Sequence, residues 1–146
     1  MTPRQAFLIQ KSFKKIAPNG KDAAKIFYDH LFQIAPETRE LFPEDMTQQY
    51  HKFMSMVETL VNSINRFNEL VPTVKELGRR HVGYEVREEH FGAVADALLL
   101  MLAQGFGSGF SRELKCAWTA GYWRLALIML DELADAPRGE ARNHAA

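Results

Sequence analysis

Apolar residues recur with helical spacing along most of the chain, and no segment reads convincingly as a strand. The clearest amphipathic pattern runs from about Thr47 to Asn65, where Phe53, Val57 and Leu60 fall on one face. Apolar residues keep this helical spacing in the other segments, which are separated by polar, proline-containing or glycine-containing breaks. This pattern predicts seven or so helices of unequal length, at about residues 3–17, 21–34, 36–42, 47–65, 70–81, 88–106 and 112–134.

The ends of these helices carry recognisable signals. Thr2 is an expected N-cap with Gln5 closing a capping box, and Ser111 is an expected cap for the last helix. The unequal lengths and the corners favour an all-α fold of crossed helices over a four-helix bundle. We expect one domain over residues 1–135, followed by a polar tail over residues 136–146 that is disordered.

Composition and charge narrow the class of protein. Hydrophobic residues make up 47% of the chain and charged residues 25%, as in globular domains, and the ten phenylalanines indicate a bulky core or an aromatic pocket. Eighteen basic and eighteen acidic side chains balance, so charge points to no nucleic-acid partner. We expect no signal peptide and no membrane span, and the single Cys116 fits a cytoplasmic location.

His81 lies in the stretch LGRRHVGYEV and is the strongest candidate for chemistry. Val74, Leu77 and His81 lie at i, i+3 and i+7, so the imidazole projects from the apolar face of its helix. A hydrogen-bonded core histidine is one interpretation of this placement. A metal ligand is the other: one histidine is too few for a zinc site but sufficient for haem iron.

Five motifs in a characteristic order then reveal a family resemblance. They are FYDHLF at 27–32, PETRELF at 36–42, LVPTVKELGRRH at 70–81, EEHFGAVADALL at 88–99 and AWTAGYW at 117–123. The chain resembles the globins, most closely the single-domain bacterial globins related to flavohaemoglobin haem domains, with some likeness to neuroglobin. The resemblance implies a globin fold of about seven crossed helices around haem b.

The resemblance also implies a set of haem-binding residues. His81 matches the proximal iron ligand, Phe42 the phenylalanine that packs on the porphyrin, and Tyr28 the tyrosine above the iron. Gln49 falls where the distal polar residue is expected, and Phe53 follows one turn later in the pocket ceiling. From the residues alone, Tyr28 could equally be a core tyrosine, and Gln49 a solvated glutamine at a helix start.

Further residues complete the expected site. Lys52 and Arg80 are possible partners for the haem propionates, and Val86 and Phe91 are further expected cofactor contacts. The other histidines, 30, 51, 90 and 144, are expected to stay away from the iron, His90 and His144 as solvated side chains, and we expect Trp118 and Tyr122 to belong to the core.

Two departures from the flavohaemoglobin pattern concern the proximal side. Phe91 stands where that group often has a tyrosine, and the position of its late glutamate falls near Leu133, with Glu132 about 100° away around the helix. We therefore expect His81 to bond mainly to a backbone carbonyl, which favours oxygen binding over activation of an O–O bond.

The expected function is reversible binding of O₂, and also of NO and CO, at a five-coordinate iron. The alternative is an enzyme, a nitric oxide dioxygenase or a peroxidase-like protein, which would need a separate reductase. A third possibility, of another class, is a haem-free helical interaction or sensory domain.

Overall fold

The computed structural model describes residues 1–83 and 86–135, and these ranges contain helices and no strand. The α-helices are α1 (Pro3–Ile16), α2 (Gly20–Ile34), α3 (Thr47–Asn62), α4 (Phe67–Gly83), α5 (Glu88–Phe106) and α6 (Arg112–Asp135), and the short 3-10 helix η2 (Pro36–Leu41) lies between α2 and α3. The all-α prediction is confirmed, and the six α-helices together with η2 match the seven predicted segments. Three shorter 3-10 helices, η1 (Ala17–Asn19), η3 (Ile64–Arg66) and η4 (Gly107–Gly109), lie between successive α-helices. The tail expected at 136–146 lies outside the described residues.

Local signals explain the helix starts that were predicted. Thr2 Oγ1 accepts a hydrogen bond from the Gln5 N–H at 3.1 Å, and the Gln5 side chain accepts one from the Thr2 N–H at 3.0 Å. This is the reciprocal capping box expected at α1. Ser111 Oγ accepts a hydrogen bond from the Leu114 N–H at 3.1 Å, which confirms the predicted cap of α6.

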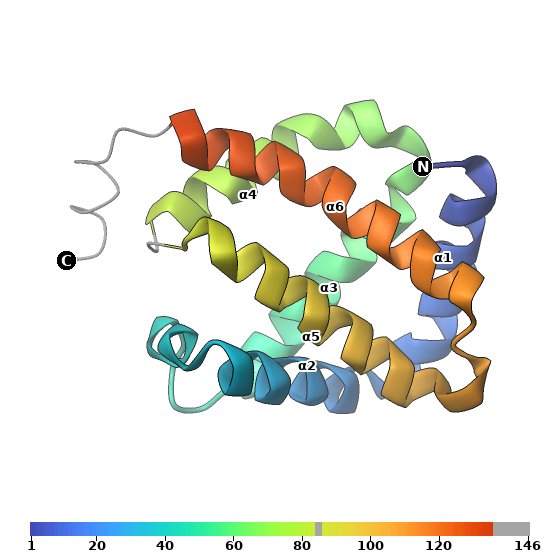
Figure 1. Cartoon of the computed structure of the whole chain (residues 1–146), viewed down its shortest axis with the longest axis horizontal. Helices are drawn as coiled ribbons and strands as arrows, with labels where there is room; N and C mark the ends of the chain where they lie inside the picture. The colour runs from blue at the N-terminus through green and yellow to red at the C-terminus, as the bar shows by residue number, and fades with distance from the viewer. Residues whose placement is uncertain (84–85, 136–146) are drawn as a thin grey trace.

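The helices cross one another (Figure 1). Helix α5 packs on α2 and α6, α4 packs on α6, and α1 packs on α6, while α3 packs on α2. The centre of the core is shielded from solvent, because Ile9, Val74, Met101 and Leu102 expose no more than 2% of their surface. The candidate site lies in the space between α3, α4, α5 and α6.

Helix α4 begins at Phe67, three residues before the predicted start, so the expected polar break over 66–69 is largely helical. Pro72 therefore lies inside the helix as its sixth residue. This position costs one backbone hydrogen bond, because proline has no N–H to donate to the carbonyl four residues earlier. Burial of Leu70 and Val74, which are 5% and 1% exposed, offsets that cost.

One helical segment, Glu88–Gly109, is long and apolar enough to cross a membrane by length and composition alone. Its helix, α5, packs against α2 and α6. It buries Leu98, Met101 and Leu102 in the core that these helices share. The apolar character of α5 is therefore explained by its place in this fold.

Candidate cofactor site

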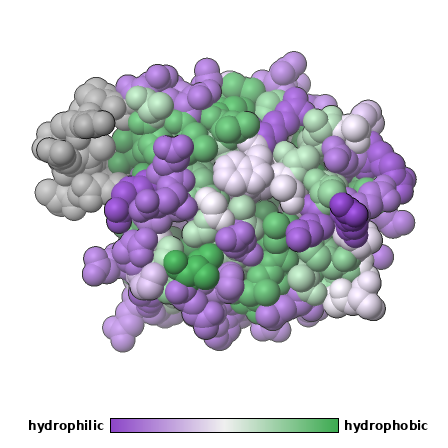
Figure 2. Space-filling model, viewed as in Figure 1, coloured by the Kyte–Doolittle hydropathy of each residue, from purple (hydrophilic) through white to green (hydrophobic). Residues whose placement is uncertain are grey.

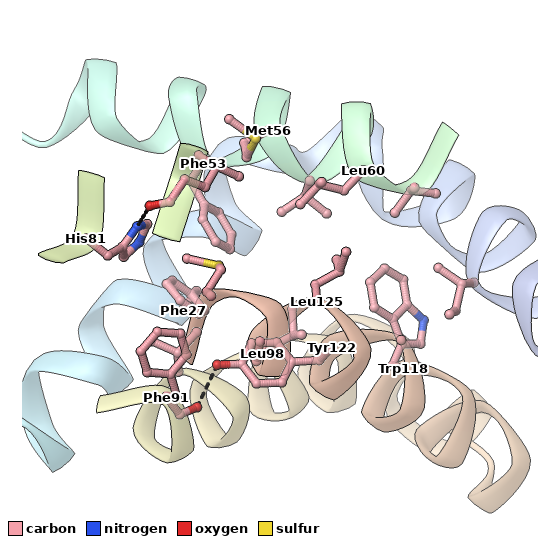
Figure 3. Close-up of a pocket in the computed structure, with 18 of the residues that line it drawn as sticks. Phe27, Phe53, Met56, Leu60, His81, Phe91, Leu98, Trp118, Tyr122 and Leu125 are labelled. Atoms are coloured by element: carbon pink, nitrogen blue, oxygen red, sulfur yellow. Dashed lines mark hydrogen bonds between the residues drawn. The ribbon is translucent and has the colours of Figure 1, made fainter. Parts of the chain in front are cut away.

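An apolar cavity of about 260 Å³ lies between α3, α4, α5 and α6 (Figure 3). Its wall is built of aliphatic and aromatic side chains, and the polar side chains in it are two imidazoles, one indole and one phenol. The residues are Ile9, Phe27, Phe53, Met56, Val57, Leu60, Val61, Ile64, Leu77, His81, Val86, His90, Phe91, Val94, Leu98, Trp118, Gly121, Tyr122, Leu125, Ala126 and Met129. Such a wall suits a flat, largely apolar ligand with one polar anchor.

His81 presents its imidazole at one end of this cavity (Figure 3). Its Nδ1 lies 2.6 Å from the Leu77 carbonyl oxygen. A carbonyl only accepts, so Nδ1 carries the proton and donates it, which leaves the Nε2 lone pair available in the neutral ring. Burial lowers the pKa of His81, against the opposing effect of the Leu77 hydrogen bond, and favours that neutral form. The Nε2 lone pair of His81 is therefore available to bind a metal.

The proximal surroundings of His81 follow the sequence-based expectation. Phe91 lies in the cavity wall and offers no side-chain hydrogen bond. Glu132 is occupied elsewhere, because its carboxylate lies 3.4 Å from the Arg79 guanidinium. The Leu77 carbonyl is the hydrogen-bond partner of the His81 imidazole among the described residues, so the prediction of a backbone partner is confirmed.

Tyr28 and Gln49 contact each other, although they lie on different helices. The Gln49 amide donates a hydrogen bond to the Tyr28 hydroxyl oxygen at 3.0 Å. Tyr28 is 4% exposed. Burial raises its pKa to about 12, while the Gln49 hydrogen bond acts the other way. The phenol thus stays protonated at neutral pH and keeps its own O–H to donate.

Tyr28 belongs to an aromatic cluster beside the cavity. Its ring centroid lies 4.9 Å from that of Phe27, 5.2 Å from Phe42 and 5.5 Å from Phe53. Phe53 stacks on Phe27 at 4.2 Å, and these two rings line the cavity. Tyr28, Gln49 and Phe42 are not part of its wall. Tyr28 contacts the wall residues Phe27 and Phe53, and Phe42 and Gln49 contact Tyr28.

The remaining expected residues divide into two groups. Val86 and Phe91 line the cavity as expected. Lys52 and Arg80 are exposed on α3 and α4. Arg80 Nε lies 4.0 Å from a Glu76 carboxylate oxygen, so a propionate would compete with a weak surface ion pair.

One histidine was assigned wrongly from the sequence. His90 was expected to be solvated, but it is 5% exposed and lines the cavity. His51 is exposed and His30 half-buried, and neither lines the cavity. A signal for His90 was available, because it lies at i with Val94 at i+4 and Leu98 at i+8, both in the cavity wall.

Hydrogen bonds fix the tautomer of His90. Its Nδ1 accepts from the Arg87 N–H at 3.0 Å, and its Nε2 lies 3.1 Å from a Glu37 carboxylate oxygen. In the neutral ring Nε2 therefore carries the proton and donates it to Glu37. Glu37, Glu89 and His90 hold potential metal-ligand atoms within 4.8 Å of one another. The tautomer argues against a metal there, because the lone pair faces Arg87 and not the carboxylates.

Trp118 and Tyr122 also have structural partners, in line with their expected place in the core. The Trp118 indole N–H donates to Ser12 Oγ at 2.9 Å. The Tyr122 hydroxyl donates to the Phe91 carbonyl at 2.6 Å, and burial raises its pKa. Both side chains line the cavity as well, which sequence reasoning did not anticipate.

Comparisons with known proteins agree on the family. The Globin family model matches residues 25–129. Leghemoglobin-1 of Lupinus luteus is 28% identical over 93% of this chain and 97% of its own length. A Bordetella parapertussis flavohemoprotein is 26% identical over 89% of this chain and 33% of its own length, so the chain spans about a third of the flavohemoproteins it matches.

A solved structure supports the same fold. The hexacoordinated haem protein of an anhydrobiotic tardigrade superposes with a TM-score of 0.81 at 17% identity, over 92% of this chain and 96% of that chain. The family match covers the helices that build the cavity, from α2 through most of α6. The chain belongs to the globin family.

Proposed function

We propose that the chain binds haem b through Nε2 of His81 and binds O₂ reversibly on the opposite side, with NO and CO as competing ligands. The observation that carries the proposal is the neutral imidazole of His81, which is held by a backbone carbonyl and lines an apolar cavity. When bound, haem would supply the iron that takes the diatomic ligand.

The cavity wall suits the porphyrin chemically. Phe53 on α3 and Phe91 on α5 offer flat apolar surfaces, and Val86 lies close to His81 in the wall. The Val86 N–H donates to the His81 carbonyl at 3.1 Å, which ties the segment after α4 to the proposed ligand. These residues exclude water and orient the imidazole.

Tyr28 and Gln49 are the proposed hydrogen-bond donors to the diatomic ligand. The Tyr28 phenol is protonated at neutral pH, far below its raised pKa of about 12. The Gln49 amide positions that phenol through the 3.0 Å bond between the two side chains. A donor aimed at a ligand that becomes partly negative slows the release of that ligand.

A nitric oxide dioxygenase that depends on a separate reductase is the second candidate. The similarity to the flavohemoprotein of B. parapertussis favours it. The proximal side favours simple oxygen binding instead, because Glu132 pairs with Arg79 and leaves His81 with a carbonyl partner. We therefore propose oxygen binding as the main role and nitric oxide dioxygenase activity as the alternative.

The domain organisation, location and partners of the protein are also proposals. Residues 1–135 would act as one globin domain in the cytoplasm, with a reductase as a protein partner and neither nucleic acid nor membrane as a binding surface. The balance of eighteen basic and eighteen acidic side chains supports only the absence of a nucleic-acid partner.

Absorption spectra of the ferric, ferrous and oxygenated protein test the proposal. We expect a Soret band after haem loading, a five-coordinate ferrous spectrum and an oxygenated form that persists. A protein that takes up no haem contradicts the proposal. Steady nitrate formation from NO with an added reductase would instead establish the second candidate.

A further inference from the structure

A buried histidine and a half-exposed glutamate join two segments that are far apart in the sequence. Glu37 is on η2 and His90 is in the first turn of α5, and their side chains are 46% and 6% exposed. Their hydrogen bond of 3.1 Å is the only side-chain hydrogen bond from η2 to another helix among the described residues. We call this pair the η2–α5 clasp.

The direction of the hydrogen bond in the clasp is fixed. The Arg87 N–H donates to Nδ1 of His90, so Nε2 must be the donor toward Glu37. Hydrogen bonds, from the backbone of Glu37 itself and then from His90, hold the pKa of Glu37 below its usual value. At neutral pH the acceptor is therefore a carboxylate, and the bond is charge-assisted.

The α5 end of the clasp lies in the cavity wall, and its η2 end is joined to the corner that carries Phe42. At the α5 end, His90 and Phe91 are consecutive wall residues, and the Phe91 carbonyl is anchored by the Tyr122 hydroxyl at 2.6 Å. At the η2 end, the Arg39 guanidinium donates to the Phe42 carbonyl at 3.2 Å and to the Pro43 carbonyl at 3.0 Å. The corner that carries Phe42 is thereby fixed to η2.

We propose that the η2–α5 clasp retains the cofactor by holding the Phe42 corner against the wall of the cavity formed by His90 and Phe91. The inference rests on the proposed binding of haem. Neither nitrogen of His90 is free to bind iron, so the histidine acts by position. Loss of the clasp would let η2 and the start of α5 separate, which opens a path for haem to leave.

The test measures haem loss from the loaded full-length protein to an excess of apomyoglobin. We expect Glu37→Leu to speed haem loss about fivefold, the effect of one charge-assisted hydrogen bond discounted for partial exposure. Glu37→Gln should restore most of the slow rate, because its amide oxygen still accepts from Nε2. Glu40→Leu is the matched control, since Glu40 is an exposed glutamate on the same 3-10 helix.

A double variant separates the clasp from other effects of each residue. Glu37→Leu combined with His90→Leu should lose haem no faster than His90→Leu alone, because the bond is already absent. The urea midpoint of the haem-free protein reports the purely structural contribution. If Glu37→Leu lowers that midpoint but leaves the rate of haem loss unchanged, the proposal is overturned.

Two further outcomes count against the clasp. An equal acceleration by Glu40→Leu, or two independent and additive effects of Glu37→Leu and His90→Leu, overturns it. Failure of the proposed function has a different signature, because the wild-type protein would then show no Soret band before any variant is made.

Discussion

The two sides of the cavity are built in different ways. On the His81 side, the candidate ligand is positioned by its own helix, through a bond to a carbonyl four residues earlier. On the Tyr28 side, the polar pair joins α2 to α3 across 21 positions of sequence. The first arrangement depends on local helix geometry and the second on how separate helices pack.

The space around each polar group differs as well. Behind His81, Gly78 lets α4 approach α6 closely, since a Cβ there would lie 3.0 Å from the Met129 Cα. Around Tyr28, bulky rings fill the space, with Phe27 and Phe53 stacked at 4.2 Å. Close backbone approach is therefore a feature of the His81 side, whereas aromatic side chains pack around Tyr28.

The largest expected effect comes from removing the proximal imidazole. His81→Leu should abolish stable haem incorporation, because the cavity wall offers no other imidazole with a free nitrogen. The haem-to-protein ratio after loading and gel filtration measures it. His51→Leu, which removes an exposed histidine of α3, should load normally. Full haem retention by His81→Leu would disprove the assigned ligand.

Alkaline pH should lower the contribution of Tyr28 to the stability of the folded protein. The pKa of Tyr28 is raised from 10.0 to about 12, so the folded state holds this proton more tightly than the unfolded chain. Below the pKa that Tyr28 has in the unfolded chain, its full contribution to the free energy of unfolding is present, about 3 kcal/mol. This contribution is lost as pH rises toward the pKa of Tyr28 in the folded protein. Urea unfolding of wild type and Tyr28→Phe should therefore diverge above about pH 10. Parallel pH profiles would contradict this.

Loss of the distal hydroxyl should have a smaller effect on ligand release. Tyr28→Phe should raise the O₂ dissociation rate about tenfold, the effect of one lost hydrogen bond to a partly charged acceptor. Stopped-flow displacement of O₂ by CO measures the rate. Tyr50→Phe removes a hydroxyl from a ring 5.9 Å away and should leave the rate near that of wild type. An unchanged rate in Tyr28→Phe would reject its distal role.

The smallest expected effect concerns the close approach of α4 and α6. In Gly78→Ala the new Cβ would meet the Met129 Cα at 3.0 Å and the Glu132 Cβ at 3.1 Å, so the helices must separate slightly. Better helix propensity offsets part of the strain, and we expect a net loss of about 1 kcal/mol in unfolding free energy. Gly92→Ala on α5 meets nothing within 4 Å and should stabilise the protein. Equal effects of both substitutions would refute the close-packing argument.

Some features of this molecule follow from short stretches of sequence. The capping box of Thr2 and Gln5 was predicted from adjacent residues and is present. The position of His81 on an apolar helix face was also predicted, and the structure places it in the cavity wall. Both succeed for one reason: helix geometry links residues three or four positions apart, and the sequence displays that spacing directly.

Other features required the tertiary structure. His90 was expected in solvent and is buried, because Glu37 and the Arg87 N–H satisfy its two nitrogens. Helix α4 was expected to start at Leu70 and starts at Phe67, so Pro72 lies inside the helix, where burial of Leu70 and Val74 offsets the hydrogen bond that Pro72 cannot make.

The sequence by itself determined the helices, their order and the residue best placed to ligate a metal, because each depends on neighbours within one or two turns. The tertiary structure decided which polar side chains from distant segments meet: Tyr28 with Gln49, Glu37 with His90 and Arg79 with Glu132. These pairings depend on how helices pack against one another, and a local pattern carries no direct record of such distant contacts.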